Sequence, residues 1–460
     1  MEVPLERLVE KKQDDLEPPC QDSQQGSRER TMKQPHPDNV ISPGPRMLLI
    51  LLTLAPFQAG ASDALLAKVV DRALETEVRM ECLADLAMLE GPLPFDQVIK
   101  VRNLARGDYV ADLARCLGRC GPKAERELRK LLRRQDSAVQ AEAVYALAMM
   151  ADEADFARSR LRMKKEPVET RVAALRALDH RDSPFARVEA LRRLSTASGP
   201  LLIEALRILD RKGMEEDIPS FIDVVADRTG MARNLAVRIL QERTGYRIGP
   251  DAKAWRWFLV KHRTEGTPFR AAETGGEENA TLVYLGIPIL GEKVVFVLDS
   301  SSSMTGRMRE SRDQTKGGQA VGELAGLLPR LPEKGEFGVV FFESSVRAFP
   351  EKNLLAWSLD GVNKASDFLN ANSFQGGTNI HGGLERAFSY RDVEEIILLT
   401  DGEPTVGRVL SPSRILSRVA KWNRWRNVRV SAISFSAPNR ARRFLNQLAR
   451  ENQGDIRIYD

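Results

Sequence analysis

The stretch that decides the fold of the C-terminal part is Val294-Val-Phe-Val-Leu-Asp-Ser-Ser-Ser-Ser-Met304. Its first five residues are apolar and mostly β-branched or aromatic, which is typical of a strand that is buried on both faces. The run then passes directly into an aspartate and four serines. A buried strand that delivers polar side chains at its carboxyl end is typical of an open α/β sheet, in which ligands bind at that edge.

Apolar runs and helical patterns alternate beyond this stretch. Further strands are expected at 337–342, 395–400, 428–435 and 455–459. Helices are expected at 314–328, 384–389, 413–425 and 441–451. This alternation predicts a mostly parallel sheet with helices on both faces, that is, an α/β doubly wound, Rossmann-like domain. We place this domain at residues 286–460.

Two more polar segments fall at the predicted functional edge of the sheet. One is Gly376-Gly-Thr-Asn379, and the other is Asp401-Gly-Glu-Pro404, which directly follows the strand at 395–400. With the first stretch they bring two carboxylates and three hydroxyls toward one point, namely Asp299, Asp401, Ser301, Ser303 and Thr378. Because these are hard oxygen donors without His or Cys among them, they favour Mg²⁺ or Mn²⁺ over zinc.

The motifs D-x-S-x-S, G-G-T-N and L-L-T-D-G occur here in this order, and residues 290–460 resemble a von Willebrand factor A (vWA) domain. The resemblance implies a metal-ion-dependent adhesion site. In such a site Ser301, Ser303 and Thr378 supply hydroxyl ligands, whereas Asp299 and Asp401 bind the metal directly or through water. It also implies that an Asp or Glu of a partner completes the coordination shell. Mg²⁺ is the expected ion, with Mn²⁺ or Ca²⁺ as alternatives.

Two features depart from the family pattern. Ser302 stands where the family commonly has glycine, which matters only if this position needs a positive φ. The sequence ends at Asp460, directly after the last predicted strand, where the family usually has a final helix. We therefore do not expect the affinity switch that works by sliding that helix.

A repeated pattern occupies the middle of the chain. Similar segments begin at Val78, Tyr109, Val139, Thr170, Leu201 and Ala232, in steps of 31, 30, 31, 31 and 31 residues. Each has apolar residues at helical spacing and a leucine at its ninth position. The pattern resembles the second helix of HEAT-type repeats and predicts an all-α, HEAT-like solenoid over residues 62–263. Trp255 and Trp257 are expected to cap its open end, and residues 264–285 to form a linker.

Four of these segments carry an arginine at their seventh position: Arg115, Arg176, Arg207 and Arg238. This arginine ladder is either a solvated helix face or a basic strip for an acidic partner, such as an anionic polymer or protein. Cysteines also recur in the array, at Cys82, Cys116 and Cys120. Two interpretations stay open for them, a disulfide or free thiols.

The first 61 residues are predicted to contain a disordered segment followed by a targeting signal. Residues 1–46 mix charges with Gln, Ser and Pro, which predicts disorder, or an untranslated extension if translation begins at Met47. The uncharged run at 47–57 is too short to cross a bilayer, and with Ala59-Gly-Ala61 it fits a signal peptide at 47–61. We therefore expect an extracytoplasmic protein, with a buried helix start as the alternative interpretation of this run.

Composition excludes several functional classes. The 69 Lys and Arg against 64 Asp and Glu give a net charge of +5 over 460 residues, which is too dilute to indicate nucleic-acid binding. The sequence has neither the G-x-S-x-G motif of a hydrolase nor the lysine of a P-loop. We expect an exported, non-enzymatic protein that binds an exposed Asp or Glu of a protein partner through the metal, with no transmembrane span. The alternatives are a cytoplasmic vWA subunit that assists an ATPase, as a chaperone or chelatase-like component, and a scaffold in which the metal only staples the domain.

Overall fold

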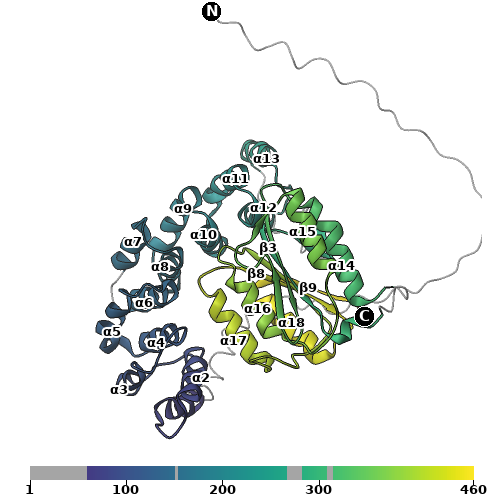
Figure 1. Cartoon of the computed structure of the whole chain (residues 1–460). Helices are drawn as coiled ribbons and strands as arrows, with labels where there is room; N and C mark the ends of the chain where they lie inside the picture. The colour runs from purple at the N-terminus through teal and green to yellow at the C-terminus, as the bar shows by residue number, and fades with distance from the viewer. Residues whose placement is uncertain (1–59, 151–153, 267–281, 308–313, 460) are drawn as a thin grey trace, which may run out of the picture. The chain divides into compact units, whose positions relative to one another are not determined.

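The computed structural model describes residues 60–150, 154–266, 282–307 and 314–459 (Figure 1). The predicted disordered segment at 1–46 and the apolar run at 47–57 lie outside these residues. Within the described part of the chain, no helix is long and apolar enough to cross a membrane. The predicted order, an all-α region followed by an α/β domain, is confirmed.

Six helices of the N-terminal region coincide with the six repeated segments. They are α2 (Thr76–Ala87), α4 (Tyr109–Gly118), α6 (Ser137–Met149), α8 (Val168–His180), α10 (Gly199–Lys212) and α12 (Gly230–Thr244), and each contacts the next. The fifth residue is an alanine in four of the six segments. These alanines, Ala143, Ala174, Ala205 and Ala236, are completely buried. A small side chain there lets neighbouring helices approach closely, so the period of the sequence is also the period of the packing.

A second set of helices alternates with the first. It comprises α3 (Phe95–Val98), α5 (Glu125–Leu131), α7 (Ala154–Arg162), α9 (Phe185–Thr196), α11 (Ile218–Asp227) and α13 (Ala252–Glu265). Trp255 of α13 is completely buried, as expected of a capping residue, but Trp257 is 66% exposed and the prediction for it was wrong. Two residues along a helix point in different directions, so only one of the pair faces the core.

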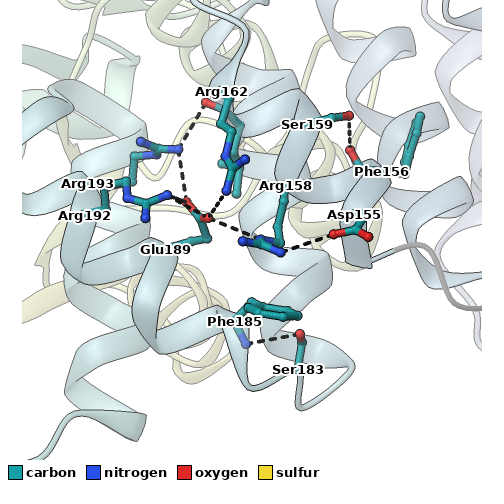
Figure 2. Close-up of polar contacts among 11 residues, drawn as sticks. Asp155, Phe156, Arg158, Ser159, Arg162, Ser183, Phe185, Glu189, Arg192 and Arg193 are labelled. Atoms are coloured by element: carbon teal, nitrogen blue, oxygen red, sulfur yellow. Dashed lines mark hydrogen bonds and ion pairs between the residues drawn. The ribbon is translucent and has the colours of Figure 1, made fainter.

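A buried carboxylate joins two of these second-set helices, α7 and α9 (Figure 2). Glu189 is 1% exposed, and Arg158, Arg162, Arg192 and Arg193 surround it, with N–O distances between 3.1 and 3.7 Å. The Arg158 guanidinium also lies 4.0 Å from the centroid of the Phe185 ring. A buried carboxylate without partners would be costly, so these arginines stabilise the array from within.

Six strands of the C-terminal domain form a sheet in the order β5-β4-β3-β7-β8-β9, and a short strand, β6, pairs with the side of β4. Their bounds are β3 (Lys293–Asp299), β4 (Glu336–Phe342), β5 (Val346–Phe349), β6 (Leu355–Ala356), β7 (Glu395–Thr400), β8 (Arg429–Phe435) and β9 (Gln453–Tyr459). The five predicted strands are present and run parallel, whereas β5 and β6 pair with β4 in the antiparallel sense. A separate hairpin joins β1 (Val283–Tyr284) and β2 (Ile287–Pro288).

Helices cover both faces of this sheet, as predicted. Phe296 and Leu298 of β3 belong to the core formed with α14 (Lys316–Leu327) and α15 (Leu359–Asn370). Val295 and Val297, the alternate residues of the same strand, belong to the core on the other face. That face is covered by α16 (Ile380–Ser389), α17 (Pro412–Asn423) and α18 (Asn439–Glu451). β3 is therefore buried on both sides, which explains its continuous apolar run.

The two central members of the arginine ladder make contacts inside the chain, and neither expectation for them was correct. Arg176 donates to Glu204 Oε1 at 2.9 Å and to Asn427 Oδ1 at 3.2 Å. Arg207 donates to the same Asn427 oxygen at 2.5 Å. Burial lowers the pKa of Arg207 to about 10. Both arginines thus serve a contact between the helical region and the loop after α17, within one compact unit of the chain.

The outer members of the ladder have local partners. Arg115 donates to Met88 Sδ at 3.2 Å, and Arg238 lies 3.9 Å from Asp210 while 45% of its side chain stays exposed. The three cysteines of the array are free thiols, so the disulfide alternative is wrong.

An acidic row on the repeated helices complements α17. The fourth residue of four repeated segments is acidic: Glu81, Asp112, Glu142 and Glu204. Three of them form ion pairs with residues spaced three apart on and just after α17: Arg418 with Glu81, Lys421 with Asp112 at 2.6 Å, and Arg424 with Glu142 at 2.6 Å. The fourth, Glu204, accepts from Asn427 Nδ2 at 3.0 Å. Three successive repeats therefore bind Arg418, Lys421 and Arg424 in turn, and a fourth contact comes from α10.

The buried Lys421–Asp112 pair allows a direct test of this contact. Lys421→Glu leaves Asp112, whose side chain is 5% exposed, opposite a like charge, and should destabilise the full chain by about 3 kcal/mol. Combining it with Asp112→Lys should restore most of the loss in a thermal melt. The matched control is Lys364→Glu, at an exposed pair with Asp360, which should change stability by less than about 1 kcal/mol. An unchanged melting temperature for Lys421→Glu would contradict the contact.

Candidate metal site

The predicted site lies where two neighbouring parallel strands end. β3 is continued through α14 into β4 on one side, whereas β7 is continued through α17 into β8 on the other. The chain thus leaves the two strands in opposite directions, which opens a crevice at their carboxyl ends. Asp299 is the last residue of β3, and Asp401 is the first residue after β7. The topology alone therefore brings these two carboxylates together.

Asp299 is almost completely buried and is held at both oxygens. Its Oδ1 accepts the Ser301 N–H at 2.8 Å, and its Oδ2 accepts the Thr400 hydroxyl at 2.6 Å. Burial raises the pKa of Asp299 to about 6, although the hydrogen bonds from Ser301 and Thr400 oppose this shift. A divalent cation beside the carboxylate would favour its charged form.

The two predicted serine ligands lie side by side. Ser301 Oγ and Ser303 Oγ are 3.1 Å apart, and Ser303 Oγ donates to Asp401 Oδ1 at 2.7 Å. Ser302 begins a short 3₁₀ helix and does not have a positive φ, so the serine in place of glycine is accommodated without strain. The first loop therefore places the two hydroxyls next to each other and bonds one of them to the carboxylate that follows β7.

Thr378 reaches the same place from the third loop. Its side chain is buried, its N–H donates to Thr405 Oγ1 at 2.8 Å, and its carbonyl accepts the Thr405 N–H at 3.0 Å. A Cβ built on Gly402 would lie 3.8 Å from Thr378 Oγ1, which places this hydroxyl beside the residue after Asp401. The structure brings all five predicted residues together.

Three residues of the site were not predicted from the sequence. Thr400 holds Asp299, and Ser300 donates its backbone N–H to Phe342 O at 2.8 Å, which ties the first loop to β4. Lys316 Nζ donates to Asp401 Oδ2 at 2.8 Å. Thr400 and Ser300 lie within the quoted motifs and could have been predicted. Lys316 lies outside the motifs, in the segment 314–328, whose pattern indicated only a helix.

The residues present fit a hard divalent cation. Two buried carboxylates face one ammonium group, so the site carries excess negative charge, and its neutral donors are hydroxyl oxygens. Ser301, Ser303, Thr378, Asp299 and Asp401 would hold the ion, directly or through water. Among the residues that the structure describes, no three His, Cys, Asp or Glu side chains gather as a metal cluster.

The comparison with protein families agrees with this geometry. Residues 292–458 match the family model described as von Willebrand factor type A domain. The C-terminal domain is thereby supported as a vWA domain.

The chain is also similar to parts of several curated proteins. The chain is 32% identical over 191 residues to inter-alpha-trypsin inhibitor heavy chain H6 of Homo sapiens, covering 38% of this chain and 14% of that protein. It is 32% identical over 225 residues to heavy chain H4 of Sus scrofa, covering 44% and 22%. It is 30% identical over 164 residues to human von Willebrand factor A domain-containing protein 3A, covering 35% and 13%. The chain thus spans less than a quarter of the length of each of these relatives.

Solved structures with similar folds include a von Willebrand factor type A protein from Catenulispora acidiphila, at 19% identity and a TM-score of 0.32, covering 36% of this chain and 38% of that one. Another is proximal thread matrix protein 1 from the mussel byssus with a zinc-occupied MIDAS motif, at 20% identity and a TM-score of 0.28, covering 36% and 41%. The assignment of the vWA domain rests on the family match and the sheet order.

Metal binding can be tested through stability. Mg²⁺ or Mn²⁺ at about 100 times its Kd should stabilise the full chain by about 3 kcal/mol, because it binds the folded site only. Asp299→Ala and Asp401→Ala should each abolish the rise in melting temperature. Asp360→Ala, at an exposed carboxylate of α15, is the control and should keep it. If neither metal changes the melting temperature of the wild-type chain, the predicted metal site is wrong.

Proposed function

We propose that the chain is a non-enzymatic protein-binding protein, and that its vWA metal site captures an acidic group of a protein partner. The observation that carries the proposal is the convergence of Ser301, Ser303 and Asp401 in one hydrogen-bonded group, with Asp299 and Thr378 beside it. Because three of the five donors are neutral hydroxyls, a bound Mg²⁺ would keep much of its positive charge. An ion of this kind favours a further carboxylate ligand, which an Asp or Glu of the partner would supply.

In this proposal, the helical region is a HEAT-like scaffold that holds the metal site in place. Its acidic row holds α17, and α17 follows the loop that carries Asp401. The same loop is bonded to Thr378 through Thr405. A fixed α17 therefore restricts the loop that carries Asp401, which favours a preorganised binding site.

The contacts of the serine and histidine side chains support a binding role over hydrolysis. The hydroxyl of Ser300 donates to Phe342 O at 3.2 Å, and the hydroxyl of Ser303 donates to the Asp401 carboxylate. His381 is buried and packs against Trp422 of α17, with ring centroids 5.5 Å apart. The nucleophile of a Ser-His-Asp triad would instead donate its hydrogen bond to a histidine.

Export is part of the proposal and rests on the apolar run at 47–57. A cleaved signal at 47–61 would place the mature chain outside the cytoplasm. Fractionation of cells that express the native gene separates this from the alternative of a cytoplasmic subunit that assists an ATPase. Cytoplasmic protein of uncleaved mass would exclude export and favour that alternative.

Partner capture should depend on the metal and on the site together. In a pull-down from native extracellular material, the wild-type chain with Mg²⁺ should retain a protein that is lost with EDTA and with Asp401→Ala. Asp360→Ala should retain it, since that carboxylate is exposed on α15 and belongs to none of the three loops. A partner bound equally by wild type and Asp401→Ala, with or without EDTA, would contradict the proposed role of the metal.

A further inference from the structure

A lysine contacts the candidate metal site from outside the three motifs. Lys316 Nζ donates to Asp401 Oδ2 at 2.8 Å, while the other oxygen of the same carboxylate accepts from Ser303 Oγ at 2.7 Å. Asp401 therefore faces a predicted metal ligand with one oxygen and an ammonium group with the other. The side chains of Lys316 and Asp401 are 13% and 1% exposed, so water screens their charges only weakly.

The backbone holds this lysine in place. Lys316 is the first residue of α14, and its N–H donates to Gly306 O at 2.9 Å. Thr315 caps the helix, since its Oγ1 accepts the Gly318 N–H at 3.0 Å. Gly306 in turn bonds through its N–H to Ser303 O at 3.0 Å, so the lysine is anchored to the loop that carries the serine ligands. The ammonium group is thus fixed at the site by the same turn that presents Ser303.

We propose that Lys316 is the second positive charge of the binding site and that it determines the preference for an anionic partner group. The inference rests on the proposed function. Without Lys316, Asp299 and Asp401 would balance the two charges of a bound divalent cation, and the attraction for a partner carboxylate would depend on direct contact with the ion alone. With the Lys316 ammonium on Asp401, the loaded site keeps one net positive charge. Lys316 therefore weakens metal binding and strengthens the binding of a carboxylate to the metal-loaded site.

This role differs in sign from a purely structural one. If Lys316 only tethered Asp401, its loss would loosen the carboxylate and weaken metal binding. If it acts through its charge, its loss removes a repulsion between two cations and strengthens metal binding. The direction of the change in metal affinity therefore separates the two roles.

The first measurement uses Mn²⁺ alone as the probe, titrated into the full chain and followed by electron paramagnetic resonance of the free ion. Lys316→Met should bind Mn²⁺ about tenfold more tightly than wild type, as expected for one charge removed a few ångströms from the ion. Lys316→Arg should stay close to wild type because it keeps the charge. Lys364→Met is the matched control, since Lys364 pairs with Asp360 on the exposed face of α15, and it should leave the affinity unchanged.

The second measurement uses acetate as the probe for a carboxylate ligand. Bound Mn²⁺ broadens the methyl proton signal of acetate that reaches the ion, and the acetate concentration for half-maximal effect reports its affinity. Lys316→Met should weaken acetate binding about tenfold at saturating Mn²⁺, again through the loss of one charge. Lys316→Gln repeats both measurements with a polar neutral side chain if the methionine variant does not fold.

The outcomes distinguish the inference from the proposed function on which it rests. Tighter Mn²⁺ binding together with weaker acetate binding supports the role of Lys316. Mn²⁺ binding by the folded neutral variants that is unchanged or weaker overturns that role, while the metal site itself stands. A wild-type chain that binds no Mn²⁺ overturns the metal site, and the inference with it.

Discussion

Two carboxylates buried at the ends of adjacent parallel strands set the constraint on which the rest of this structure depends. β3 and β7 pair directly, so Asp299 and Asp401 meet at an edge that water barely reaches. Buried charges are costly unless they are paired and hydrogen-bonded. The surrounding residues meet that need, since Thr400 and Ser301 bond to Asp299, while Ser303 and Lys316 bond to Asp401. A divalent cation would complete the compensation.

The contact between the helical region and the vWA domain also depends on charged side chains that are paired with one another. Acidic side chains occupy the same position in four of the six repeated segments, and basic side chains recur every third residue on α17 and the turn after it. The pairs are mostly buried, so each also fixes α17 in one position. The helix that follows the Asp401 loop is therefore held by residues more than 300 positions earlier in the chain, such as Asp112 beside Lys421.

The sequence was informative wherever a feature is local or periodic. The strand 294–298 and its aspartate could be predicted because burial on both faces leaves a continuous apolar run. The six helices of the repeated segments could be predicted from the period of the sequence. What escaped prediction depends on residues far apart in sequence, as with Arg176 and its partner Asn427, or Lys316 and Asp401. The period located the arginine ladder but not its partners, while the acidic row lay unnoticed in the same segments. β5 and α15 were missed because their apolar patterns are short and interrupted.

We expect one divalent cation to bind among the hydroxyls of Ser301, Ser303 and Thr378, next to Asp401. Anomalous diffraction from crystals of the chain grown with saturating Mn²⁺ would locate the ion. We expect a single strong peak roughly 2 Å from the two serine hydroxyl oxygens, with Lys316 still hydrogen-bonded to Asp401. Two results would contradict this expectation. One is the absence of a peak at this edge of the sheet, and the other is an ion bound by other residues and by none of the five predicted ligands.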